Sequence, residues 1–244
     1  MRNTIRWKRR FTQSVVAGVV SCLTTTSMVR GQGTGPLPYR PGIDVTDYAI
    51  TLDLPQRGAS IEGRAVLSVR RWAPVDTLVL DLVGLRVDSV LVDEKPVTFA
   101  RTDSLVRVPI ASVVGDSFSV TVRYTGEPKD GLIVRTDSAG RWTAFGDNWP
   151  NRARNWIPSI DHPSDKATVT WTVRAPSERR VVANGELMEE TPLPAQAGSV
   201  PRTLTRWRES RPIPVYLMVI AAAPLVYYDL GREGCGVGEF SSCV

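Results

Sequence analysis

Histidine is the scarcest chemically useful residue in this 244-residue sequence, because His162 is the only one present. A single histidine excludes a His-Glu-x-x-His zinc helix, a three-histidine zinc site and a two-histidine iron site. The sequence also contains no Gly-x-Ser-x-Gly nucleophile elbow, no phosphate-binding glycine loop and no Cys-x-x-Cys pair. We therefore expect no catalytic residue, no metal site and no cofactor in this chain.

The side chains with the most chemical potential lie between residues 140 and 165, in a stretch crowded with Trp, Arg, Asn and Pro. Asp161, His162 and Asp165 could in principle hold a cation, but such residues in a proline-bounded loop more often bond to backbone groups. A serine next to His162 in the sequence does not create the geometry of a catalytic triad. We expect a structural role, in which Arg154 and Asp161 form a charge-assisted pair or bond to the backbone.

The elements that must position this loop are strands. Apolar and polar residues alternate with a period of two on both sides of it, and turn residues such as those at 93–96 and 126–131 separate the runs. We expect strands within residues 43–54, 65–69, 78–82, 85–87, 90–92, 105–108, 118–124, 167–175, 179–183, 203–207 and 215–221, with residues 140–165 and 190–201 as loops. Many short strands predict an all-β fold, a sandwich or curved antiparallel sheets.

The loop also resembles a known family signature. The stretch from Phe145 to Ala167 is similar to the loop-to-strand signature of the aminopeptidase N-like (gluzincin) zinc metallopeptidases. The matching positions are Pro150, Ala153, Arg154, Pro158, Asp161, Pro163, Lys166 and Ala167. Further similarity lies at residues 44–48, 78–90, 182–186 and 212–217, so the resemblance covers about residues 39–228.

The resemblance implies a saddle-like antiparallel β-sandwich, the N-terminal domain of such a peptidase. In that family the domain packs on a thermolysin-like catalytic domain of the same polypeptide, which supplies the zinc ligands, the general base and the transition-state tyrosine. The expected partners are that catalytic domain and a peptide substrate. Zinc is expected in the full-length enzyme only.

Three positions depart from the family pattern. Asp147 stands where the family usually has Gln, Trp149 where Glu or Gln often helps to hold the free amine of the substrate, and Ser159 where Cys is common. Asp147 and Trp149 are therefore the candidate substrate-binding residues, without the usual acid. We expect Trp149, Trp156, Ile157 and Pro158, with Leu225 and Val226, to form an apolar surface against the catalytic domain; the alternative is that Trp149, Trp156 and Ile157 belong to the core.

The first 31 residues have the character of an export signal. They contain six basic side chains and no acidic one, followed by a short apolar run around residues 15–23 that is too short to span a bilayer stably. Without those six, 24 basic side chains face 25 acidic ones, so the formal net charge falls from +5 to −1. The remaining chain has no basic surplus that would favour nucleic acid or anionic lipid.

These features divide the chain into a signal peptide at residues 1–31, a linker at 32–42, the β domain at 43–230, and a truncated connector at 231–244 toward a catalytic domain absent from this chain. Export to the periplasm or the extracellular space would permit a disulfide between Cys235 and Cys243. Two unrelated thiols are the alternative. Cys22 leaves open a lipoprotein signal.

Two functions are compatible with these features. The first is a noncatalytic N-terminal domain of an exported zinc metallopeptidase, of the aminopeptidase kind. The second is a secreted β-sandwich binding module that uses its Trp-rich loop to hold peptide or carbohydrate.

Export by signal cleavage predicts a mature chain that begins near Gln32 and lacks Cys22. Intact-mass measurement and N-terminal sequencing of exported protein check this. An acylated Cys22 in the membrane fraction would instead establish the lipoprotein route.

Overall fold

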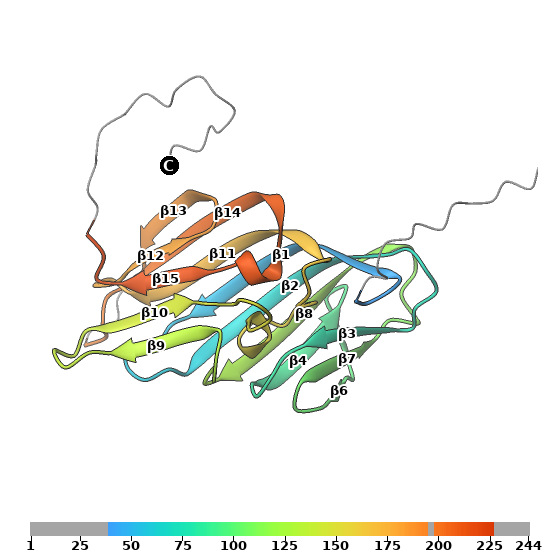
Figure 1. Cartoon of the computed structure of the whole chain (residues 1–244), viewed down its shortest axis with the longest axis horizontal. Helices are drawn as coiled ribbons and strands as arrows, with labels where there is room; N and C mark the ends of the chain where they lie inside the picture. Colours follow the sequence, from blue (N-terminus) through green and yellow to red (C-terminus); the bar gives the residue numbers. More distant parts are fainter. Residues whose placement is uncertain (1–38, 195–197, 227–244) are drawn as a thin grey trace, which may run out of the picture. The chain divides into compact units, whose positions relative to one another are not determined.

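The computed structural model describes residues 39–194 and 198–226 (Figure 1). These residues form β-strands and two 3₁₀ turns, which confirms the expected all-β class. The expected signal peptide, the expected connector at residues 231–244, Cys22, Cys235 and Cys243 lie outside the described residues. No helix among the described residues is long and apolar enough to cross a membrane.

The largest sheet has eight strands in the order β13-β14-β11-β1-β2-β8-β4-β5. Its strands are β1 (Ile43–Asp53), β2 (Ile61–Arg71), β4 (Arg86–Val92), β5 (Lys95–Val97), β8 (Ser117–Gly126), β11 (Lys166–Pro176), β13 (Glu186–Pro192) and β14 (Arg202–Pro214). Neighbouring strands are antiparallel except β1 and β11, which run parallel with Tyr48 opposite Val169 and Ile50 opposite Trp171. That parallel pair joins the N-terminal strands to those that follow the signature loop.

Two smaller sheets complete the fold. One contains β12 (Arg180–Ala183), β15 (Ile220–Ala223), β10 (Trp142–Gly146) and β9 (Leu132–Thr136) in that order, and the other contains β3 (Thr77–Asp81), β7 (Leu105–Pro109) and β6 (Ala100–Arg101). In Figure 1 both lie in front of the eight-stranded sheet. The buried side chains of all three sheets belong to one apolar cluster, as expected for a sandwich.

Period-two alternation explains which face of the large sheet is buried. In β1 the side chains of Tyr48, Ile50 and Leu52 are buried while the residues between them are partly exposed. On β2 the same face requires a glycine at position 63, because a Cβ there would lie 2.2 Å from Cζ of the Tyr124 ring. Tyr124 therefore occupies the space that a side chain at position 63 would need.

Some expected loops are strands. The stretch expected as a loop at residues 140–165 includes β10, and the loop expected at 190–201 includes the last residues of β13. The expected strand at 215–221 is instead a 3₁₀ turn at Val215–Leu217 followed by β15. The sequence predicts neither β9 nor β13, since neither carries a clear buried face in its sequence.

The expected apolar surface needs a correction at three of its positions. Trp156, Ile157 and Pro158 are buried within this chain, and Trp156 stacks on Trp171 of β11 with ring centroids 5.5 Å apart. These residues belong to the core and not to a surface that a partner covers. Trp149, by contrast, is 62% exposed.

Replacing Trp156 by serine should lower the free energy of unfolding by roughly 3–5 kcal/mol, because the change removes a buried aromatic ring and leaves a cavity. Trp149→Ser, the matched control, should cost less than about 1.5 kcal/mol, since its ring is mostly exposed and makes an edge contact with Tyr216. Urea denaturation of both variants measures the difference. Equal losses would contradict the assignment of Trp156 to the core.

Candidate functional site

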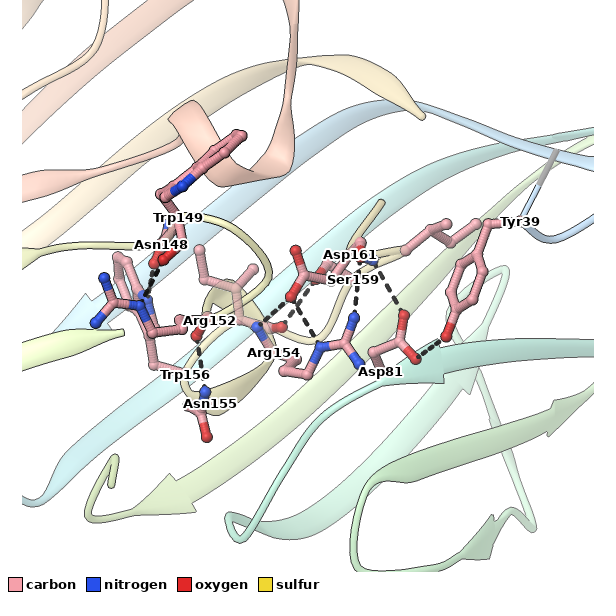
Figure 2. A network of polar contacts seen from close by, with 12 residues as sticks. Tyr39, Asp81, Asn148, Trp149, Arg152, Arg154, Asn155, Trp156, Ser159 and Asp161 are labelled. Carbon is pink, nitrogen blue, oxygen red and sulfur yellow. Dashed lines mark hydrogen bonds and ion pairs between the residues drawn. The ribbon is translucent and has the colours of Figure 1, made fainter. Parts of the chain in front are cut away.

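The signature loop, residues 147–165, connects β10 to β11 and contains one 3₁₀ turn at Ala153–Asn155. The Trp149–Pro150 peptide bond is cis. Figure 2 shows the polar contacts that fix the loop, with Tyr39 and Asp81 at one end and Trp149 at the other. The sequence signature is thus one continuous structural unit.

Arg154 and Asp161 form the expected charge-assisted pair at the centre of the loop. The Arg154 Nε atom donates to Asp161 Oδ2 at 3.0 Å, and the Arg154 backbone N–H donates to the same oxygen at 3.1 Å. The Arg154 Nη2 atom also donates to the Asp161 carbonyl at 3.0 Å. The guanidinium therefore closes the loop on itself across seven residues (Figure 2).

Asp81, at the end of β3, attaches this closed loop to the sandwich. Its Oδ2 atom accepts the Asp161 backbone N–H at 3.1 Å, and a pair of backbone hydrogen bonds joins Asp81 to Ser159. Its Oδ1 atom accepts from Arg40 Nη2 at 2.9 Å and from the Tyr39 hydroxyl at 3.3 Å. The carboxylate is buried, so these donors replace water around it.

Burial raises the pKa of the Asp161 carboxyl, and nearby Asp81 raises it further, while the hydrogen bonds from Arg154 lower it. Tyr48 lies beneath the same segment and its hydroxyl accepts the Ile160 N–H at 3.1 Å. Burial also raises the pKa of Tyr48, with Asp165 as the next contributor. The Asp161 carboxyl and the Tyr48 hydroxyl are therefore both used to hold the backbone of the loop in place.

A second anchor holds the other half of the loop. The buried Asn148 side chain accepts a hydrogen bond from Trp156 Nε1 at 2.7 Å and donates to the Met218 carbonyl at 2.7 Å. Gly131 lies against this turn with a φ of +77°, where a Cβ would be 2.2 Å from the Arg152 carbonyl oxygen. Glycine is required there by both the backbone angle and the lack of space.

The two candidate substrate-binding residues lie at the exposed end of the loop. Asp147 is paired with Arg152, whose Nη2 atom is 2.5 Å from Asp147 Oδ2, and Arg152 also contacts Asp130 at 3.3 Å. Trp149 packs edge-on against Tyr216 at 5.1 Å between ring centroids. Asp147 therefore has a partner within the chain, whereas most of the Trp149 ring is open to solvent.

The other signature residues divide between core and surface. Ala153, Pro158 and Asp161 are buried and Arg154 is partly buried, while Pro150, Pro163 and Lys166 are exposed. The structure adds Asp81, Asn148 and Tyr48 to the network. All three lie in stretches that resemble the family, but sequence reasoning gave none of them a role, because Tyr48 and Asp81 bond to the loop from distant strands and Asn148 also bonds to Met218.

The described residues do not fit a metal ion. Within residues 39–194 and 198–226, no three His, Cys, Asp or Glu side chains come together as potential ligands. His162 stacks on Tyr39, and its Nδ1 atom is hydrogen-bonded to Ser164 Oγ at 2.7 Å. Zinc therefore has no site among the residues that the structure describes.

Asp165, the last residue of the loop, is the exception to the pattern of paired charges. It is buried, its Oδ1 atom accepts a long hydrogen bond of 3.4 Å from Val45 N–H, and its Oδ2 atom has no partner within the described residues. Burial raises the pKa of this carboxyl to about 7, opposed by the Val45 hydrogen bond and aided by the charge of Asp44.

This raised pKa gives stability a definite pH dependence. The folded state binds more protons than the unfolded state between the unfolded pKa of about 3.9 and the folded pKa of about 7. The free energy of unfolding should therefore fall as pH rises through that range, by about 4 kcal/mol in total from Asp165.

Asp165→Asn should remove this dependence, so the variant should match the wild type near pH 4 and exceed its stability above pH 7. Urea unfolding of both proteins at several pH values measures the difference between them. A variant that is less stable than the wild type at pH 8 would show that the Asp165 carboxylate is compensated in the folded state.

Comparison with known proteins identifies the family to which this fold belongs. The family model described as the peptidase M1 N-terminal domain matches residues 45–217. The leucyl aminopeptidase of Saccharolobus solfataricus is 28% identical over 158 residues, which are 61% of this chain and 19% of that protein. The chain thus spans about a fifth of that relative.

Solved structures of M1 peptidases and related hydrolases have the same fold as this chain. An M1 zinc metallopeptidase from Deinococcus radiodurans aligns with a TM-score of 0.63 and 27% identity over 75% of this chain and 42% of its own. Native yeast LTA4 hydrolase aligns with a TM-score of 0.67 and 24% identity over 78% of this chain and 30% of its own, which shows the shared fold. This chain belongs to the peptidase M1 N-terminal domain family.

Proposed function

We propose that this chain is the noncatalytic N-terminal domain of an exported, zinc-dependent metallopeptidase of the aminopeptidase kind, and that it supports and docks the catalytic domain. The observation that carries the proposal is the family match across residues 45–217. The relatives are described as an aminopeptidase and a zinc metallopeptidase, and each extends well beyond the matched part. Peptide hydrolysis would belong to that further part.

An uncovered apolar face supports the docking role. The outer face of the four-stranded sheet carries a cross-strand row in which Val182 is opposite Ala221, Ala221 is opposite Phe145, and Phe145 is opposite Ile133. The exposed apolar residues on and beside this sheet are Phe145, Trp149, Val182, Leu217, Leu225 and Val226, which we call the docking face. Monomers rarely leave large apolar surfaces open to water, and we assign the cover of these side chains to the catalytic domain.

The same face would bring the exposed end of the signature loop to the boundary with the catalytic domain. Asp147 and Trp149 lie at that end, so they are the residues through which this domain would contact a peptide substrate. Asp147 can bind the substrate directly only if its ion pair with Arg152 opens. If the pair stays closed, the two side chains form an uncharged edge beside the substrate. We regard the indole of Trp149 as the main contact with substrate. Most of its ring is open to solvent, so it can bind a peptide without breaking an ion pair, unlike Asp147.

The exposed indole of Trp149 also favours the second candidate, a secreted module that binds peptide or carbohydrate through its loop. The coding sequence beyond Val244 separates the two. A downstream His-Glu-x-x-His followed by a later Glu supports the peptidase domain. A stop codon followed by an unrelated gene supports the module.

If the docking face is a covered interface, the whole chain should bind a hydrophobic dye while folded, and Phe145→Asp should weaken that binding. The free energy of unfolding should change by less than about 1 kcal/mol, because Phe145 is largely exposed. Dye fluorescence and urea denaturation provide the two readouts. Dye binding unchanged by Phe145→Asp would contradict the assignment.

Val114→Asp is the matched control, since Val114 is 94% exposed and lies outside the docking face. It should leave dye binding as in the wild type. In a protein that includes the catalytic domain, dye binding should be lost without any substitution, and the hydrolysis of amino-acid anilides should require that added domain.

A further inference from the structure

A hollow lies on the outer face of the eight-stranded sheet, across the neighbouring strands β1, β2, β8 and β4. In β2 and β8 the side chains of Arg64 and Arg123 alternate with the buried ones of Ala65 and Val122, so the two arginines point away from the smaller sheets. The hollow is thus separate from the docking face. Its volume is about 370 Å³, and the charged residues in its lining are Asp53, Glu62, Arg64, Arg86, Asp88, Arg123 and Arg174.

Arg64 and Arg123 form a like-charged pair across two strands. Arg64 of β2 lies directly opposite Arg123 of β8, a position in which the two Cβ atoms are about 4.5–5.5 Å apart. Like charges in directly opposite positions destabilise a sheet. Neither guanidinium group makes an ion pair or a hydrogen bond among the described residues. The pair therefore lowers the stability of the sheet unless an anion binds to both groups.

The acidic residues of the lining do not supply that anion. Asp53 lies 3.3 Å from Arg174 and also bonds to a second arginine from outside the hollow. Asp88 is paired with Arg86 at 3.0 Å. Glu62 is exposed and makes no ion pair among the described residues. Four arginines face three acidic residues in the lining, and the second arginine at Asp53 adds a further positive charge, so the hollow favours an anion over a cation.

The number of open donors selects the kind of anion. Each guanidinium group presents a planar fork of N–H donors that matches two oxygen atoms. A carboxylate has only two oxygen atoms, so a single arginine already satisfies it. A phosphate group has more oxygen atoms and carries up to two negative charges near neutral pH. Two adjacent forks without partners therefore fit one phosphate group better than one carboxylate.

We propose that this hollow binds the phosphate group of a small molecule, with the guanidinium groups of Arg64 and Arg123 as the donors. Binding replaces the repulsion between the two cations by charge-assisted hydrogen bonds to one shared anion. Both groups lie on the outer face of the sheet, so the ligand reaches them directly from solvent. Inorganic phosphate and phosphate esters share this chemistry. The inference does not depend on the proposed peptidase role.

The test is a titration of the whole chain with sodium phosphate and with glycerol 3-phosphate, at constant ionic strength and a pH above 7, followed by amide chemical shifts. Both probes should move the signals of Arg64, Arg123 and Thr125 in a saturable way. In Arg123→Gln the affinity should fall about tenfold or more, as expected for the loss of a charge-assisted hydrogen bond. This substitution removes a like-charge contact at an exposed position, so the variant should remain folded.

Arg107→Gln is the matched control, because Arg107 is an exposed arginine of β7 outside this hollow, and it should leave the affinity unchanged. Glu62→Gln removes the unpaired acid of the lining, so it should tighten phosphate binding. Equal affinities for the two probes identify the phosphate group alone as sufficient, and tighter binding of glycerol 3-phosphate identifies a phosphate ester as the ligand.

Three results would overturn the proposal. The first is that neither probe gives saturable shifts at Arg64 and Arg123. The second is that Arg107→Gln weakens binding as much as Arg123→Gln, which would show attraction to the surface charge as a whole. The third is that sodium acetate at the same ionic strength binds as tightly as phosphate, which would show that the two open forks do not act together on one group.

Discussion

The burial of the Asp81 carboxylate is the constraint on which the arrangement of the signature loop depends. A carboxylate removed from water is costly unless hydrogen-bond donors surround it. Asp81 obtains them from segments far apart in the sequence: the side chains of Tyr39 and Arg40 and the backbone of Asp161. The N-terminal segment, the end of β3 and the loop before β11 must therefore meet at one point.

This meeting point explains why one side of the loop packs into the core while its other end is exposed to solvent. Arg154 closes the loop on Asp161, and the closed turn carries Trp156 into the core against Trp171. With Trp156 fixed, Asn148 is anchored to it, and the residue that follows, Trp149, is directed outward. A core anchored by nonlocal hydrogen bonds thus holds an exposed aromatic side chain in a defined place, which is what a docking or substrate-contacting loop requires.

The sequence predicts those parts of the fold and the site that have a local pattern. Strands β1, β8 and β11 are predictable because their buried side chains alternate with exposed ones, whereas β13 is an edge strand with nearly all its side chains exposed. The pair of Arg154 and Asp161 is predictable too. Trp156 is not, since a loop tryptophan can equally fill a core or form an interface, and only Trp171 and Asn148 decide. Nonlocal hydrogen bonds such as those of Asp81 leave no periodic signal in a single sequence.

Asp161 and Asp165 lie four residues apart in one loop, and both are buried. They differ in whether a cation accompanies the buried carboxylate. Asp161 has Arg154 as a partner, whose hydrogen bonds offset part of the effect of burial on its pKa and close the loop. Asp165 has burial without compensation, and its charged form therefore opposes folding above its pKa of about 7. An asparagine would keep the acceptor for Val45 N–H without that cost. At neutral pH and above, the carboxylate at position 165 therefore lowers the stability of the sandwich, and no arginine among the described residues offsets this cost.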